Sequence, residues 1–122
     1  MSRSIDELVQ GYLDSWNETD AGKRRATIEK HFTNDCTYTD PLASVNGPGG
    51  VDGFIAAVQK QYPGIVFALG GKVDTHHNQV RFTWHAGAPG ASEPAVIGFD
   101  VAVFENGRIR HVYGFLDKAP PG

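Results

Sequence analysis

The chain has 122 residues, of which 40% are hydrophobic and 20% are charged, and these proportions are typical of one soluble globular domain rather than of a disordered segment. The net charge of −3 argues against a general electrostatic attraction to nucleic acid or to an anionic membrane. The expected partner is therefore a small molecule or a second copy of the chain.

The sequence also argues against several other classes of protein. Its single cysteine, Cys36, excludes an internal disulfide and a cysteine-rich metal site. No apolar run reaches the roughly 18 residues of a membrane span, and residues 1–6 lack the features of a signal peptide. The spacing of the five histidines does not suggest a metal site. We therefore expect a cytoplasmic protein with no metal and no cofactor.

Two helices are predicted at the start of the chain. Ser4 and Glu7 form the sequence pattern of a capping box, and apolar residues then recur at helical spacing over residues 5–16. Asp20 can cap a second helix over residues 21–31. The first helix is strongly amphipathic, so one of its faces should lie against the core.

A short strand and a third helix follow. The β-branched and aromatic residues 36–39 predict a strand that ends before Pro41. The glycine-rich segment 42–50 lacks the Lys-Ser/Thr pair of a phosphate-binding loop, and is interpreted as a turn. A helix is predicted from Val51 to about residue 62, ended by Pro63.

The second half of the chain has the pattern of strands. They are predicted over residues 65–69, 72–75, 80–85, 95–104 and 108–116. Asn106-Gly107 is the signal of a tight turn that makes the last two strands antiparallel neighbours. Helices followed by antiparallel strands predict an α+β fold in which the helices pack on one face of a sheet.

Asp100 interrupts the most apolar of these strands, and burying a carboxylate costs several kcal/mol unless it is paired, hydrogen-bonded or protonated. Gly98 and Ala102 share its face of the strand, because side chains alternate between faces. These small neighbours leave room for a ligand, and Phe82 and Trp84 on the preceding strand line either the same pocket or an ordinary core. Asp100 is therefore a candidate site residue.

The opposite face of this strand carries a row of apolar side chains, Ile97, Phe99, Val101 and Val103. Helices packed on the other side of the sheet cannot cover this row, and an exposed apolar patch of this size usually marks an interface. We therefore expect a homodimer formed through the sheet.

Several motifs together resemble the NTF2-like superfamily over residues 1–122, and within it the ketosteroid isomerases and the SnoaL-like polyketide cyclases. They are Tyr12 on the first helix, the segment 32–41 that ends in Asp40-Pro41, and the terminal hairpin 99–109 that contains Asp100. The resemblance implies one cone-shaped domain, with three N-terminal helices packed on a strongly curved, mainly antiparallel sheet. In the cyclases a carboxylate is expected on the last strand, where this chain has Tyr113.

The resemblance also implies catalytic roles. Asp40 would be the base that moves a proton beside a carbonyl, and Tyr12 with a protonated Asp100 would donate hydrogen bonds to the oxygen where negative charge develops. The ligand, a small apolar molecule of steroid, polyketide or terpenoid type, would lie against Phe54, Phe82, Trp84, Gly98, Ala102 and Tyr113.

Structural roles compete with each of these assignments. Tyr12 can be a core residue, Asp40 a turn residue before Pro41, and Asp100 the partner of a buried cation. Two functions therefore stay open: an acid–base enzyme of isomerase or cyclase type, or a module on the same fold that binds an apolar ligand or a partner without turnover.

Overall fold

The computed structural model describes residues 4–119, which form three helices and seven strands. The helices are α1 (Ile5–Asn17), α2 (Ala21–His31) and α3 (Gly47–Gln61). The strands are β1 (Phe32–Thr39), β2 (Ser44–Asn46), β3 (Val66–Leu69), β4 (Asp74–His76), β5 (Gln79–Gly87), β6 (Val96–Glu105) and β7 (Arg108–Lys118).

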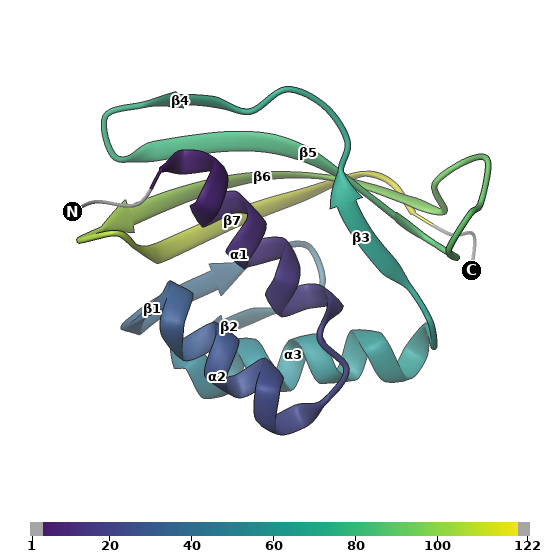
Figure 1. Cartoon of the computed structure of the whole chain (residues 1–122), viewed down its shortest axis with the longest axis horizontal. Coiled ribbons are helices and arrows are strands. Elements are labelled where there is room, and N and C mark those ends of the chain that lie inside the picture. Colours follow the sequence, from purple (N-terminus) through teal and green to yellow (C-terminus); the bar gives the residue numbers. More distant parts are fainter. Residues whose placement is uncertain (1–3, 120–122) are drawn as a thin grey trace.

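The strands form one curved sheet in the order β2-β1-β7-β6-β5-β3, with β4 paired to β5. Neighbouring strands are antiparallel except for β1 and β7, which run parallel. The three helices gather on one side of this sheet (Figure 1). The predicted α+β fold, with helices packed on a strongly curved and mainly antiparallel sheet, is confirmed.

The ends of the first two helices follow their predicted capping chemistry. The Ser4 side chain accepts a hydrogen bond from the Glu7 backbone, and the Glu7 side chain accepts one from the Ser4 backbone. Asp20 caps α2 by accepting from the backbone N–H of Lys23. Each cap satisfies donors that the first helical turn leaves without a partner.

The interpretation of the glycine-rich segment 42–50 as a turn was wrong in its second half. Residues 44–46 form β2, and α3 begins at Gly47 rather than at Val51. Gly47 has a φ of +73°, a conformation that favours glycine. Pro48 lies in the first turn of α3, where its missing N–H removes no helical hydrogen bond.

A buried polar network fixes α3 against the other helices. Arg24 on α2 is 5% exposed, and its Nε lies 2.6 Å from Oδ1 of Asp52 on α3. Gln59 of α3 donates to the carbonyl oxygens of Trp16 and Glu18 at the end of α1, at 2.9 Å each. The network matters for the site because α3 and the end of α1 form two walls of a cavity.

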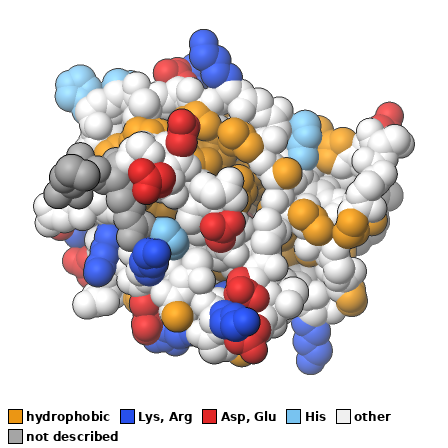
Figure 2. Space-filling model, in the orientation of Figure 1, with side chains coloured by type: hydrophobic (Ala, Val, Ile, Leu, Met, Phe, Trp, Pro, Cys, Tyr) orange, Lys and Arg blue, Asp and Glu red, His pale blue; other side chains and the backbone are white. Residues whose placement is uncertain are grey.

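The sheet surface turned away from the helices carries large apolar side chains. Ile97, Phe99, Val101 and Val103 of β6 are half-buried. On β7, Tyr113 is 44% and Phe115 is 58% exposed. On the face drawn in Figure 2, Lys and Arg side chains alternate with Asp and Glu and form no single basic patch. No helix within residues 4–119 is long and apolar enough to cross a membrane.

Candidate functional site

A cavity of about 460 Å³ lies between α3, the end of α1 and the inner face of the sheet. This volume is within the range of small-molecule sites, roughly 300 to 1,000 Å³. Six aromatic side chains line it, namely Trp16, Tyr38, Phe54, Tyr62, Phe67 and Trp84. Among the described residues that line it, Asp40 is the only charged side chain. The cavity therefore combines an apolar body with one carboxyl group.

Asp40 is held firmly at the wall of this cavity. Its Oδ1 accepts hydrogen bonds from the backbone N–H groups of Leu42 and Ala43, at 2.7 and 3.0 Å. Its Oδ2 accepts from the Tyr38 hydroxyl at 2.6 Å. The backbone contacts are those expected of a turn residue before Pro41, but they leave the carboxyl on the cavity wall. Asp40 can therefore act both as a turn residue and as the carboxyl group of the site.

Tyr38 is a site residue that the sequence reasoning missed. It is 2% exposed, lines the cavity and donates to Asp40. Burial, followed by the charges of Asp100 and Asp40, raises the pKa of the Tyr38 phenol above its ordinary value, so this group stays a donor. The available signal was the spacing of two residues between Tyr38 and Asp40, which places both side chains on one face of an extended segment.

Tyr12 and Asp100 form a hydrogen-bonded pair behind the cavity wall. The Tyr12 hydroxyl donates to Oδ2 of Asp100 at 2.6 Å, and the two residues are 2% and 1% exposed. The pKa of Asp100 is raised from 3.8 to about 6: burial is the largest cause, the nearby Asp40 raises it further, and hydrogen bonds from Tyr12 and Trp84 offset part of the rise. Burial and the adjacent Asp100 raise the pKa of Tyr12 well above 10. Asp100 is thus a carboxyl that holds its proton more tightly than usual.

Gly114 allows the two carboxyl groups to approach each other. It lies opposite Asp100 in the β6–β7 register. A Cβ atom placed on Gly114 would lie 2.8 Å from Oδ1 of Asp100 and 3.2 Å from Cβ of Asp40. A side chain at this point would force Asp100 or its neighbours to shift, so the glycine lets β7 lie close to both Asp40 and Asp100.

The predicted ligand-contacting residues divide into two groups. Phe54 and Trp84 line the cavity. Phe82, Gly98, Ala102 and Tyr113 lie outside its lining. The space above Gly98 is filled by the Trp84 indole, since a Cβ there would overlap with its ring.

Phe82, Ala102 and Tyr113, the other predicted residues outside the cavity lining, have different neighbours. The Phe82 ring packs against Tyr12 with centroids 5.7 Å apart, and Ala102 is buried in the same core. Tyr113 points to the opposite side of the sheet and stacks on His111. The alternation along β6 and β7 correctly grouped residues by face, but a shared face does not say which of them reaches a cavity.

The described residues therefore bring all three predicted catalytic side chains into one region, in a different arrangement from the one expected. Asp40 faces the cavity, whereas Tyr12 and Asp100 bond to each other behind it. The phenols of Tyr12 and Tyr38 are each hydrogen-bonded to a carboxyl group, so the region contains both donors and acceptors of protons. Such a set can support general acid–base chemistry, because Asp40 is placed to accept a proton and the raised pKa of Asp100 lets that carboxyl keep its proton up to about pH 6.

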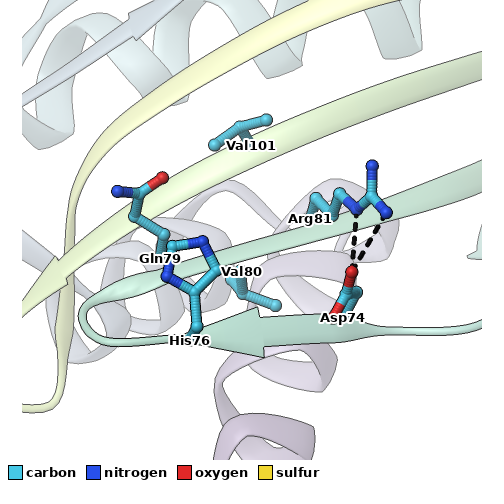
Figure 3. Close-up of a pocket in the computed structure, with 6 residues that line it drawn as sticks. All are labelled: Asp74, His76, Gln79, Val80, Arg81 and Val101. Atoms are coloured by element: carbon cyan, nitrogen blue, oxygen red, sulfur yellow. Dashed lines mark hydrogen bonds and ion pairs between the residues drawn. The ribbon is translucent and has the colours of Figure 1, made fainter.

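A second hollow, of about 310 Å³, lies beside β4, β5 and β6 (Figure 3). Its only described ion pair joins Arg81 to Asp74, with Nη2 and Nε 3.0 and 3.1 Å from Oδ2 (Figure 3). Both side chains are more than half exposed, so this hollow is a solvated surface feature. Within residues 4–119, no group of three His, Cys, Asp or Glu side chains is arranged to hold a metal ion.

Comparison with known proteins places this geometry in a family. A structure from Agrobacterium tumefaciens, named as a candidate isomerase of the SnoaL-like family, shares 36% identity over 91% of this chain and 95% of its own, with a TM-score of 0.86. A candidate polyketide cyclase from Sinorhizobium meliloti (17% identity, 92% and 98% coverage, TM-score 0.71) and a candidate ketosteroid isomerase from Kribbella flavida (18%, 95% and 82%, 0.69) share the fold. No curated protein matches the sequence. Because the model of the SnoaL-like domain matches residues 9–112, the chain belongs to the SnoaL-like domain family of the NTF2-like fold.

Proposed function

We propose that the protein is a cofactor-independent acid–base enzyme that moves a proton beside a carbonyl group of a small apolar ligand. The observation that carries this proposal is the position of Asp40 as the single charged side chain on the wall of an aromatic cavity. In an apolar site a positioned carboxylate can take a proton from the carbon next to a carbonyl. The relative from Agrobacterium tumefaciens, which is named as a candidate isomerase of the SnoaL-like family, adds support to an enzymatic role.

Tyr12 and Asp100 are proposed as the donors that stabilise the oxygen where negative charge develops. In the structure Tyr12 donates to Asp100. A carbonyl oxygen inserted between them would accept a hydrogen bond from Tyr12 and a second one from protonated Asp100. Because the pKa of Asp100 is raised to about 6, this second donor would be lost as the pH climbs past about 6.

A ligand-binding module without turnover is the competing function. It is favoured by the fact that Tyr12 and Asp100 satisfy each other and lie outside the cavity lining. In that case the cavity would hold an apolar compound, and Asp40 would only shape the loop after β1.

One experiment separates the two functions. Steroids, aromatic polyketides and terpenoids that contain a ketone are screened for thermal stabilisation of the protein, since a ligand at 100 times its Kd adds about 2.7 kcal/mol of stability. Conversion of the best ligands is then compared between the protein and Asp40→Asn. If the protein is an enzyme, turnover should fall by about 100-fold or more in Asp40→Asn, while the Kd of the ligand stays within about tenfold. Ligand binding without turnover in either protein would establish the binding module.

We also propose that two copies of the chain associate through the outer face of the sheet. The support is the half-buried apolar row of β6 together with the exposed rings of Tyr113 and Phe115. Burying these side chains against an identical face would remove a large apolar patch from water.

A further inference from the structure

The carboxylate of Asp40 on the cavity wall has no ion-pair partner among the contacts described for residues 4–119. Four arginines of the described residues form ion pairs: Arg24 with Asp52, Arg25 with Glu29, Arg81 with Asp74, and Arg110 with Asp35 and Glu105. Neither Asp40 nor Asp100 takes part in any of them. Among residues 4–119, no Lys, Arg or His lines the cavity, so Asp40 is the charged group that sets the electrostatic potential at its wall.

The hydrogen bonds to Asp40 fix its direction without neutralising it. All three donors, the Tyr38 hydroxyl and the N–H groups of Leu42 and Ala43, are uncharged. Each carboxylate oxygen can accept more than one hydrogen bond, and Oδ2 accepts only from Tyr38 among the described contacts. A charged donor from outside the protein can therefore still bind to this oxygen.

The rest of the cavity has the surface that attracts an organic cation. Trp16, Tyr38 and Phe54 form a mutually packed group of rings, with centroids 5.5 to 5.9 Å apart and Phe54 edge-on to Trp16. The faces of aromatic rings carry partial negative charge and bind ammonium groups, while their area also favours hydrocarbon. One carboxylate beside several rings is thus suited to a molecule that is both apolar and positively charged.

We propose that this cavity is a binding site for apolar organic ammonium compounds, with Asp40 as the counter-ion and the aromatic rings around the hydrocarbon body. This inference goes beyond the proposed enzymatic function and does not rest on it. An amine bound at Asp40 would occupy the group that is proposed to accept the substrate proton. Apolar amines should therefore bind in competition with carbonyl ligands, and carboxylates of the same shape should be rejected.

The test uses three probes with one aromatic body and different charges: naphthylethylamine, naphthylethanol and naphthylacetate. Their dissociation constants are measured by calorimetry near neutral pH. Attraction to a partly buried carboxylate predicts that the ammonium compound binds about tenfold or more tightly than the alcohol, and that the carboxylate binds more weakly than the alcohol. In Asp40→Asn the advantage of the amine over the alcohol should fall below about threefold, because only the charge has been removed.

Two further variants make the result independent of the folding of Asp40→Asn. Gln61 lines the cavity from the exposed end of α3, so Gln61→Lys adds a cation there. This variant should weaken binding of the amine about tenfold or more relative to binding of the alcohol. Asp14→Asn, on the exposed face of α1 and outside the cavity lining, removes the same unit of charge and should leave the affinity ratio unchanged.

Three outcomes would overturn the inference: equal affinity of the amine and the alcohol, an amine preference that survives both cavity variants, or binding of none of the probes. All three concern binding alone. Absence of turnover with carbonyl compounds would refute the proposed enzyme and leave the amine site standing.

Discussion

Replacing Asp100 by Asn should change the pH dependence of stability in a defined direction. Burial raises the pKa of Asp100 from 3.8 to about 6, so the folded protein holds a proton that the unfolded chain releases between about pH 4 and pH 6. The stability contributed by this carboxyl is therefore complete below about pH 4 and is lost as the pH climbs past 6. A shift of about 2 units corresponds to about 3 kcal/mol.

Asp100→Asn removes this titration while keeping the size of the side chain and an oxygen that can accept from Tyr12. The unfolding free energy of the variant, relative to that of the unmodified protein, should rise by about 3 kcal/mol between about pH 4 and pH 7. Urea unfolding followed by tryptophan fluorescence at several pH values measures this difference. Asp14→Asn, at an exposed position, controls for the change in net charge.

Two results would refute this reasoning. A difference that stays constant with pH would mean that the buried carboxyl does not hold its proton more tightly than the unfolded chain does. A difference of the opposite sign would mean that Asp100 is stabilised in its charged form, as an ion-paired carboxylate would be.

Three other predictions concern two contacts in the site and the dimer interface. Gly114→Ala should destabilise the fold by about 1–3 kcal/mol in thermal unfolding, because its Cβ would lie 2.8 Å from Asp100 Oδ1; a loss below about 0.5 kcal/mol would mean that the site easily relaxes. Tyr38→Phe should cost about 1–3 kcal/mol in urea unfolding, since Asp40 loses a 2.6 Å hydrogen bond in a half-buried site, and an unchanged midpoint would argue against this bond. Light scattering at micromolar concentration should find a dimer that Phe115→Glu converts to a monomer; a monomeric unmodified protein would refute the proposed interface.

Most of the framework could be predicted because local patterns agreed with the fold. The capping box at Ser4, the helical spacing of α1 and the Asn106-Gly107 turn each depend on neighbours in sequence. The start of α3 was missed because Gly47 and Pro48 favour turns as strongly as helix starts, and the buried Val51 and Ile55 further along decide between them.

The site could be predicted in part for the same reason. A carboxyl in an apolar strand marked Asp100, which is 1% exposed, and alternation placed its neighbours on the correct face. Alternation could not reveal that the Trp84 ring covers Gly98, nor that Tyr12 donates a hydrogen bond to Asp100. The Tyr12–Asp100 pair depends on how α1 packs against β6, 88 residues further along the chain, and no local pattern encodes that contact.

The central claim is that Asp40 removes a proton from the carbon beside a carbonyl in this cavity. Hydrogen–deuterium exchange tests it directly, because it needs no knowledge of the final product. Apolar ketones that stabilise the protein are incubated with it in D2O at about pH 6, where part of Asp100 still holds its proton, and deuterium incorporation beside the carbonyl is followed by mass spectrometry. The account predicts exchange at least about 100-fold faster with the unmodified protein than with Asp40→Asn; equal rates with the two proteins would contradict it.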